Sequence, residues 1–156
     1  MARKDYFNDP DAPTANSVVA SVVAAVRNAN GDLLMIHRTD NDRWALPGGG
    51  HDIGESISQT VVREVLEETG IHVEVTGLVG IYTNPNHVMA YDDGEVRQQF
   101  SICFTARPTS GTLTTSSESR EVVWVDPARL DDLDIHPSMR LRIDHALADL
   151  PRPYIG

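Results

Sequence analysis

Glutamates between positions 55 and 68 are the part of this sequence best placed to do chemistry. On an α-helix each residue advances by about 100°, so Glu64, Glu67 and Glu68 would lie within one arc roughly a quarter-turn wide. Like charges four residues apart, such as Glu64 and Glu68, repel each other and destabilise a helix. The arrangement makes sense if cations bind there, because closely spaced carboxylate oxygens suit Mg²⁺ or Mn²⁺.

Residues around these glutamates are consistent with a cation site. Arg63 lies four residues before Glu67, close enough to hold that carboxylate without occupying its cation-facing oxygens. Glu55 comes just ahead of the helix, where negative charge meets the positive end of the helix dipole. The glycines at positions 48–50 let the backbone approach a ligand, and a bare carbonyl there can join the coordination of a cation.

Each of these features also has an ordinary structural explanation. Three glutamates on one side describe the solvated face of many surface helices, and a glycine run describes a flexible turn. Taken alone, the glutamates favour that explanation. The complete pattern of residues from Gly49 to Ile71 favours the cation site instead.

That pattern resembles the Nudix box of the MutT-like hydrolases. The resemblance covers every defining position of the box without a gap, and a match with this many constrained positions is specific. The matching residues are Gly49, then after five residues Glu55, then after seven more Arg63-Glu64-Val65-Leu66-Glu67-Glu68-Thr69-Gly70-Ile71. The resemblance implies an α/β/α sandwich around a mixed β-sheet, with the box forming a loop–helix–loop metal site.

The resemblance also implies a role for each matching residue. Arg63 would hold a box glutamate in position, with Glu55 in support. The Mg²⁺ ligands, with Mn²⁺ as the substitute ion, would be the carbonyl of Gly49 and the carboxylates of Glu64, Glu67 and Glu68. The reaction would be attack of water on a phosphorus of a diphosphate linked to another group. Cations would neutralise the phosphates, orient the anhydride and activate the water.

The general base stays open between two groups of residues. A glutamate of the box is one choice, and we prefer Glu64 or Glu67. A glutamate from a loop outside the box is the other, and Glu118 and Glu121 lie at the end of a Ser/Thr-rich segment and the start of the next predicted strand. The candidate catalytic residues are therefore Glu64, Glu67, Arg63 and Glu121, with Glu118 as the alternative to Glu121.

Other chemically capable residues have simpler explanations. The histidines at 37, 51, 72 and 87 show no metal-ligand spacing with cysteine or with one another, so no zinc site is expected. Cys103 alternates with phenylalanines and is expected to be a small buried hydrophobe. Trp44 could stack on a base, although core packing explains its position. The arginines at 38, 43 and 97 could contact a phosphate, although solvation at the surface explains each of them.

The clearest predicted element is a helix over residues 56–69. Ser56 and Gln59 have the spacing of a capping box, and Gly70 supplies a left-handed stop. A second helix is expected from Pro137 onward. Strands are expected over 17–27 (covered on both faces), 32–37 (after a turn at Asn30-Gly31), 44–46, 72–83 (with a break at Gly77), 96–106 and 121–125. Residues 47–50 are expected to be irregular, 84–94 a polar loop, and 109–119 mobile.

These elements predict an α/β fold with a mixed sheet between helices. The domain division expected is a loosely held arm over residues 1–16, a single domain over 17–150 and a tail over 151–156. The longest apolar run is too short to span a membrane, and the N-terminus lacks a signal-peptide pattern. With a single cysteine, the expected location is the cytoplasm.

The charge balance limits the partners. A formal net charge of −10 argues against a nucleic-acid surface but leaves room for a small nucleotide-like diphosphate bound through cations. Pro85 lies near the position of a proline in ADP-ribose pyrophosphatases of the family, which favours ADP-ribose-like substrates slightly over nucleoside triphosphates. A homodimer is plausible by resemblance. The rival hypotheses are a non-catalytic nucleotide-binding regulator, disfavoured because every box carboxylate is present, and an RNA-decapping enzyme, disfavoured by the charge.

Overall fold

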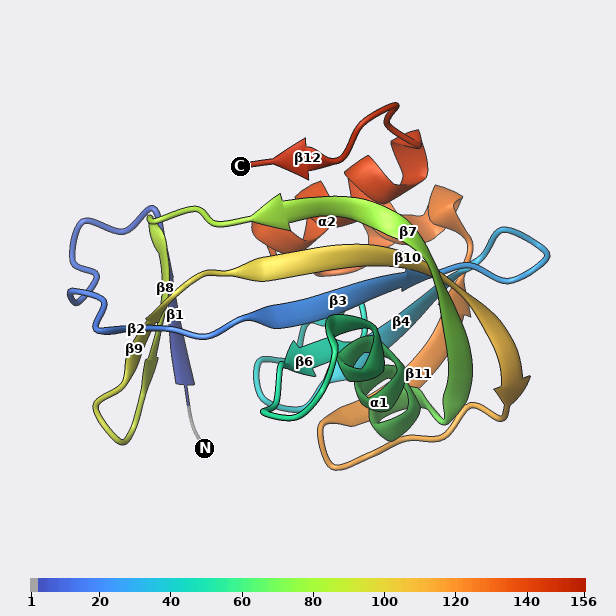
Figure 1. Cartoon of the computed structure of the whole chain (residues 1–156), viewed down its shortest axis with the longest axis horizontal. Helices are drawn as coiled ribbons and strands as arrows, with labels where there is room; N and C mark the ends of the chain where they lie inside the picture. Colours follow the sequence, from blue (N-terminus) through green and yellow to red (C-terminus); the bar gives the residue numbers. More distant parts are fainter. Residues whose placement is uncertain (1–2) are drawn as a thin grey trace.

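Strand β3 (Ser21–Val26) runs through the middle of the computed structural model, which describes residues 3–156 (Figure 1). Within the described residues, β3 belongs to a five-stranded mixed sheet in the order β12-β7-β10-β3-β6. Its neighbours are β6 (Gly48–Gly50), β7 (Ile71–Tyr82), β10 (Ser101–Gly111) and β12 (Tyr154–Ile155). β3 runs parallel to β10 and antiparallel to β6, so the sheet is mixed.

Helices cover both faces of this sheet. Helix α1 (Ile57–Thr69) packs on one face, and helix α2 (Pro137–Ala148) lies on the other (Figure 1). Because side chains alternate along a strand, Val22, Ala24 and Val26 of β3 face the cluster that holds Val61 and Val65 of α1. The α/β/α arrangement expected from the sequence is confirmed.

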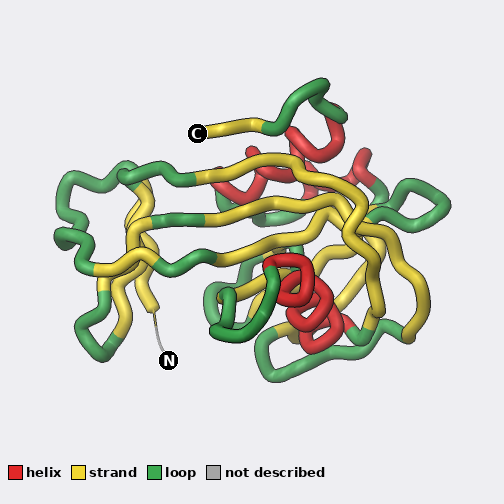
Figure 2. The backbone as a smooth tube through the Cα atoms, viewed as in Figure 1, coloured by secondary structure: helices red, strands yellow, loops and turns green. Residues whose placement is uncertain are grey.

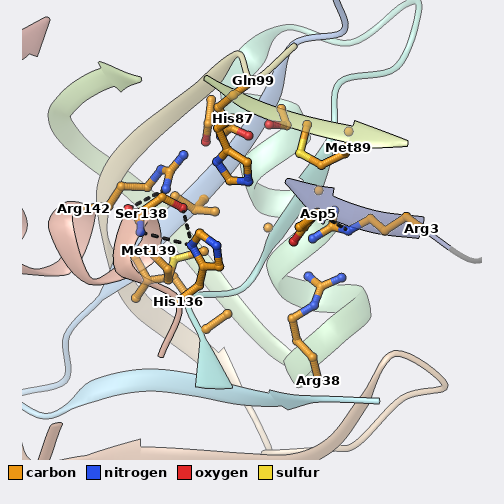
Figure 3. A pocket seen from close by; sticks show the side chains of 18 of the residues that line it. Arg3, Asp5, Arg38, His87, Met89, Gln99, His136, Ser138, Met139 and Arg142 are labelled. Carbon is orange, nitrogen blue, oxygen red and sulfur yellow. Dashed lines mark hydrogen bonds and ion pairs between the residues drawn. The ribbon is translucent and has the colours of Figure 1, made fainter. Parts of the chain in front are cut away.

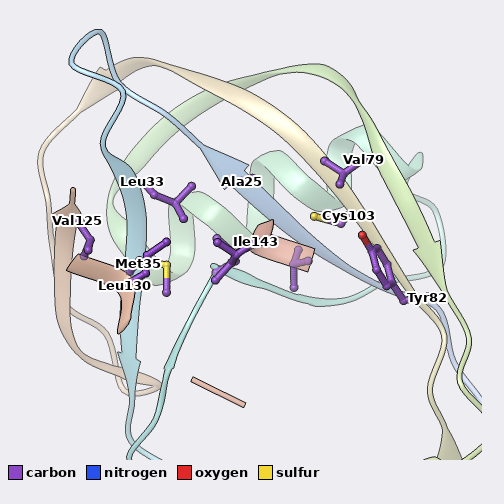
Figure 4. Close-up of a cluster of buried hydrophobic side chains, with 11 residues drawn as sticks. Ala25, Leu33, Met35, Val79, Tyr82, Cys103, Val125, Leu130 and Ile143 are labelled. Atoms are coloured by element: carbon purple, nitrogen blue, oxygen red, sulfur yellow. The ribbon is translucent and has the colours of Figure 1, made fainter. Parts of the chain in front are cut away.

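The intervening residues of β3 build the core on the opposite face. Val23 and Ala25 pack with Cys103 of β10 and with Ile143 of α2 (Figure 4). Every side chain from Val22 to Val26 is therefore buried, which confirms two-sided cover for this part of the strand predicted over 17–27. The start of that segment was predicted wrongly, because Ser17–Val18 form β2 in another sheet and Val18 is exposed. Cys103 is a buried free thiol in this cluster, as expected.

Two smaller sheets extend the central one (Figure 2). The first has the order β11-β4-β5 and the second the order β1-β8-β9-β2. Their strands are β1 (Arg3–Phe7), β2 (Ser17–Val18), β4 (Leu33–Arg38), β5 (Trp44–Ala45), β8 (His87–Tyr91), β9 (Val96–Gln98) and β11 (Ser119–Val125), and a 3₁₀ helix, η1 (Pro127–Asp132), leads from β11 towards α2. No helix in the described part of the chain is long and apolar enough to cross a bilayer.

Short strands form at segments where the sequence predicted loops. Residues 48–50, expected to be irregular, pair with Ser21–Val23 as the edge strand β6. Residues 87–91, expected to belong to a polar loop, form β8 between β1 and β9. In both cases pairing with a neighbouring strand satisfies the backbone hydrogen-bonding groups. A local pattern of glycine or polar residues does not reveal such pairing.

The terminal segments also contain paired backbone. Of the arm expected over residues 1–16, Met1 and Ala2 lie outside the described residues, and Arg3–Phe7 form β1 against β8. In the expected tail, Tyr154–Ile155 form β12, parallel to Gly80–Ile81 of β7. The predicted break at Gly77 is a bulge, because the pairing of β7 with β10 shifts register there while β7 continues.

Candidate active site at helix α1

Helix α1 carries the acidic residues and is held firmly at both ends. The Ser56 hydroxyl accepts from the backbone N–H of Gln59 at 3.2 Å, and the Gln59 side chain accepts from the backbone N–H of Ser56 at 2.8 Å. Gly70 ends the helix in the left-handed conformation, at φ 77°. These are the predicted capping box and stop. Val61 and Val65 are buried against the sheet, Glu68 is buried beside them, and Glu64 is partly buried.

Arg63 connects most of the acidic groups of the box. Its guanidinium donates to Glu55, to Glu64 at 2.9 Å and to Glu67 at 3.4 Å. It also donates to the backbone carbonyl of Gly50 at 3.1 Å. The Arg63 guanidinium lowers the pKa of Glu55 to about 2, and the Thr60 hydroxyl, which donates to Glu55, adds to the effect. Arg63 thus joins the loop before the helix to the helix itself.

Glu68 and Glu64 are acidic groups in an environment that disfavours their charge. Glu68 is only 3% exposed, and burial, with the nearby charge of Glu64, raises its pKa to about 8. Burial also raises the pKa of Glu64, although Arg63 partly opposes the shift. The backbone N–H of Gly48 donates weakly to Glu68, at 3.4 Å. A buried carboxylate beside a partly buried one forms a site for positive charge.

The backbone of β6 lies directly against these carboxylates. A Cβ added at Gly49 would lie 2.5 Å from the carboxylate carbon of Glu64, so any larger residue would displace this carboxylate. At Gly50 a Cβ would meet no atom within 4 Å. At Gly48 a Cβ would lie 2.0 Å from the carbonyl oxygen of Val22, so the pairing of β6 with β3 requires glycine there. The contact with Glu64 belongs to Gly49, whose carbonyl the family resemblance places at the metal site.

A cleft lies over the three box glutamates and receives one glutamate from outside the box. Glu64, Glu67 and Glu68 line it together with residues 48–50 and Glu118. The Ser119 hydroxyl donates to the backbone carbonyl of Glu68 at 2.7 Å, which ties the segment carrying Glu118 to the end of the helix.

The structure does not bring Glu121 to this cleft. Its register on β11 places it opposite His37 of β4, and its carboxylate lies 3.9 Å from His37 Nδ1, with the side chain 56% exposed. The candidate base outside the box is consequently Glu118. The sequence did not distinguish the two, because the register shift between Ser119 and Glu121 decides which side chain faces the helix.

The donor set fits a hard divalent cation. Carboxylates of Glu64 and Glu68 lie beside a bare glycine backbone, and hard oxygen donors of this type are those that Mg²⁺ and Mn²⁺ prefer. Among residues 3–156, no three acidic, histidine or cysteine side chains are arranged as a finished ligand group. Arg63 draws two of the box carboxylates towards itself, so the site as described is neutralised in part by its own arginine.

A second cavity adjoins this cleft, and its lining includes Arg38, Arg43 and Arg97, which the sequence offered as possible phosphate contacts. Its other polar side chains, Asp5 and His136 among them, were not assigned to a site from the sequence. The cleft and the cavity share Arg3, Arg38 and residues 48–50. Figure 3 shows Arg3 and Arg38 beside this cavity, with Asp5, His87 and His136 at its wall. Arg38 is paired with Asp40 through two hydrogen bonds, at 2.9 and 2.7 Å. These residues lie far apart in sequence, so no local motif marks them. Trp44, which was expected in the core, is partly buried; it packs against the hydrophobic core cluster and stacks on His37.

Comparison with known proteins identifies the family. The model of the NUDIX domain matches residues 17–146. A MutT-like protein of Streptomyces ambofaciens is 38% identical over 130 residues, which cover 81% of this chain and 77% of the relative. A putative 8-oxo-dGTP diphosphatase of Bacillus subtilis is 30% identical over 105 residues, covering 67% of this chain and 64% of the relative.

Solved structures agree at the level of the fold. A NUDIX hydrolase from Nitrosomonas europaea superimposes with a TM-score of 0.69 at 20% identity, covering 88% of this chain and 93% of that structure. The family match spans most of the chain and includes the whole box. This chain therefore belongs to the Nudix family of pyrophosphohydrolases.

Proposed function

We propose that this chain catalyses the Mg²⁺-dependent hydrolysis of a phosphoanhydride bond in a nucleoside diphosphate linked to another group. The observation that carries the proposal is the pair of carboxylates beside the backbone of β6, with Glu68 buried and the Glu64 side chain 12% exposed. Burial of two like charges costs stability unless a cation compensates it. When bound, Mg²⁺, or Mn²⁺ in its place, would neutralise phosphate charge and activate the attacking water.

The roles of the protein groups follow from their contacts. Glu64, Glu67 and Glu68, with the carbonyl of Gly49, would hold the ions. Arg63 is a positioning residue, because it fixes Glu64 and Glu67 while also holding the preceding loop through Glu55. Glu64 or Glu67 would accept the proton of the attacking water, with Glu118 as the candidate from outside the box.

Two kinds of substrate are compatible with the proposed reaction. Pro85 favours ADP-ribose-like compounds, and the relative named as a putative 8-oxo-dGTP diphosphatase favours nucleoside triphosphates. Both kinds carry a diphosphate and would leave two phosphate-bearing products. The proposal includes a cytoplasmic location, which the buried, unpaired thiol of Cys103 supports.

The test is the turnover of a substrate panel by two variants, Glu67→Gln and Glu68→Gln. Both should fold and should lose kcat by orders of magnitude with Mg²⁺. Mg²⁺ should raise the Tm of the wild type by more than it raises that of Glu68→Gln, because an ion that binds only the folded state stabilises it. Glu74→Gln is the matched control, since Glu74 pairs with Arg107 on the exposed surface of the central sheet.

Several results would count against the proposal. Near-normal rates in both variants would remove Glu67 and Glu68 as metal ligands. No turnover of nucleoside triphosphates, ADP-ribose, dinucleoside polyphosphates or nucleotide sugars by the wild type, together with tight nucleotide binding, would instead indicate the non-catalytic alternative. Glu118→Gln and Glu121→Gln, measured in the same assay, separate the two candidate bases outside the box. Only the Glu118 variant should be slow.

A further inference from the structure

The loop between β6 and α1 is tied to the helix through one histidine. His51 directly follows β6, and its backbone N–H donates to the carbonyl of Ala20 at 3.0 Å, just before β3. Its ring nitrogen Nδ1 lies 2.6 Å from the hydroxyl oxygen of Thr60, which is near the start of α1 and is 0% exposed. His51 therefore connects the strand that carries Gly49 to the helix that carries the box glutamates.

The Thr60 hydroxyl extends this contact to Glu55. It lies 2.8 Å from Glu55 Oε2 and 3.3 Å from the backbone carbonyl of Ser56. At neutral pH the Glu55 carboxylate can only accept, because Arg63 lowers its pKa to about 2. A hydroxyl has one hydrogen, and the contact with the charged oxygen of Glu55 is both shorter and stronger than the one with Ser56. Thr60 therefore donates to Glu55.

This direction of donation determines the tautomer of His51. Because the hydroxyl hydrogen of Thr60 is directed to Glu55, its oxygen must accept from the histidine, and Nδ1 must carry the proton. In an uncharged ring Nε2 is then the bare nitrogen. The opposite tautomer would take the hydrogen of Thr60 for itself and leave Glu55 without that hydrogen bond.

Glu55 connects the same chain of hydrogen bonds to the glutamates proposed as metal ligands. Arg63 donates to both of its carboxylate oxygens, with Nη2 at 3.1 Å from Oε2. The same guanidinium donates to Glu64 at 2.9 Å and to Glu67 at 3.4 Å, and to the carbonyl of Gly50 at 3.1 Å. Since the guanidinium is planar and rigid, the position of Glu55 affects the direction of the donors that hold the other two carboxylates.

Stability alone does not require a polar pair at this place. Two buried apolar side chains of similar shape would leave no donor or acceptor unsatisfied, and such a replacement is close to neutral for stability. The histidine and the threonine add direction, because each hydrogen bond in the chain has one donor and one acceptor. Groups that orient metal ligands in this way affect the affinity for the metal although they do not touch it.

We propose that His51 is a positioning residue for the cation site and that it acts through the hydroxyl of Thr60. The hydroxyl holds Glu55, and Glu55 holds the guanidinium of Arg63 in the direction that presents the box carboxylates to the cation. The inference rests on the proposed function and assigns a role to a residue that precedes the helix and is not a metal ligand.

The first test measures the tautomer in the metal-free full chain. Nitrogen NMR separates protonated from bare imidazole nitrogens, and the signals of His51 are identified by their loss in His51→Asn. At about pH 9, where histidine rings are uncharged, Nδ1 should be protonated and Nε2 bare. Thr60→Val should shift the ring towards the other tautomer, because Nδ1 loses its acceptor. A wild-type ring with the proton on Nε2 would overturn the inference.

The second test compares Mn²⁺ affinity among variants of similar shape. The electron paramagnetic resonance signal of free Mn²⁺ gives the Kd. His51→Leu, which has no donor, should raise the Kd by about tenfold, the lower end of the effect expected for groups that orient metal ligands. His51→Asn places an amide N–H near the position of Nδ1 and should restore a Kd close to that of the wild type.

The double variant His51→Leu/Thr60→Val separates positioning from stability. Its Kd for Mn²⁺ should be no higher than that of the worse single variant, because both changes break one chain of hydrogen bonds. Its Tm should equal or exceed that of Thr60→Val, since no buried donor is left without an acceptor. Matched controls are His72→Leu and Thr76→Val, exposed positions on β7 that should leave the Kd unchanged.

Three outcomes would overturn the inference. A Kd for His51→Leu equal to that of the wild type would do so and leave the proposed function standing, as would a Kd for His51→Asn as high as that of His51→Leu. Kd values that rise only as far as the Tm falls, across all the variants, would show a purely structural role. A wild type that binds no Mn²⁺ would instead overturn the proposed function, and the inference with it.

Discussion

Arg63 and Glu68 differ in how well their surroundings stabilise a charge. Arg63 is surrounded by carboxylates and a backbone carbonyl, and its hydrogen bond to Glu55 raises its pKa. Glu68 is buried, and the hydrogen bond that it accepts from the backbone N–H of Gly48 is long, at 3.4 Å. Arg63 has several hydrogen-bond partners, whereas the Glu68 carboxylate has only the weak one. Since burial of a poorly paired carboxylate is costly, the residue-scale evidence for function lies in Glu68 rather than in the number of glutamates.

Gly49 allows a direct test of the close approach between backbone and carboxylate. Gly49→Ala should lower kcat by at least about tenfold, because the new Cβ would displace the Glu64 carboxylate from its position. The fold should survive, since the obstructed atoms belong to the end of a side chain. Activity and circular dichroism, measured together, check both statements.

Gly50→Ala is the comparison variant, because its Cβ meets nothing within 4 Å and its backbone does not adopt a positive φ. It should lose far less activity than Gly49→Ala. Equal losses in the two variants would show that general stiffening of the loop, and not contact with Glu64, limits the reaction.

His87 predicts a pH dependence of stability. Its pKa is about 4 in the folded protein against 6.5 in the unfolded chain, so the unfolded state binds the proton more readily. Stability is therefore lost as pH falls from 6.5 to 4, by at most about 3 kcal/mol. Asp5 opposes the shift, while His136, Arg142 and Arg3 reinforce it.

Urea unfolding of the wild type and of His87→Phe between pH 4 and pH 7 measures this contribution. The wild type should lose stability more steeply than the variant as pH falls. The variant should keep a smaller dependence, because burial lowers the pKa of His136 as well. Parallel curves for the two proteins would show that the ring of His87 is not held uncharged.

Helices and strands could be predicted from the sequence where the local residue pattern and the tertiary environment favour the same structure. Helix α1 begins and ends at the predicted caps, and β3 shows the two-sided burial that its apolar run indicates. The strands β6 and β8 were missed because they are short, and because their pairing depends on partners elsewhere in the chain. Glycine-rich and polar segments carry little intrinsic strand preference, so tertiary contacts decide their conformation.

The cap of α1 gives a prediction at the level of the element. Ser56→Ala should lower the free energy of unfolding by about 1 kcal/mol, because the hydrogen bond from the backbone N–H of Gln59 to the Ser56 hydroxyl is lost. Denaturant unfolding measures the change. Ser58→Ala, an exposed position within the same helix, is the control and should be neutral or slightly stabilising. An equal loss in the two variants would contradict a role for the cap.

At the scale of the whole molecule, the net charge affects which classes of ligand the protein can bind. The net charge of −10 repels a polynucleotide, whereas in the proposed function a small diphosphate would bind through cations at the carboxylate cleft. We therefore expect no saturable binding of a 20-nucleotide RNA at physiological salt in a fluorescence anisotropy titration. A salt-dependent Kd below about 1 µM would contradict this expectation.

The sequence alone determined the box, its helix and the covered strand beside it, and through them the family. These features depend on residues that are close in the chain, where spacing translates directly into geometry. Tertiary structure alone decided that Glu118 and not Glu121 lies at the cleft, and that Asp5, His87 and His136 meet in a second cavity. Strand register and the docking of β1 bring those residues together, and neither leaves a local signal because both arise from contacts between distant segments.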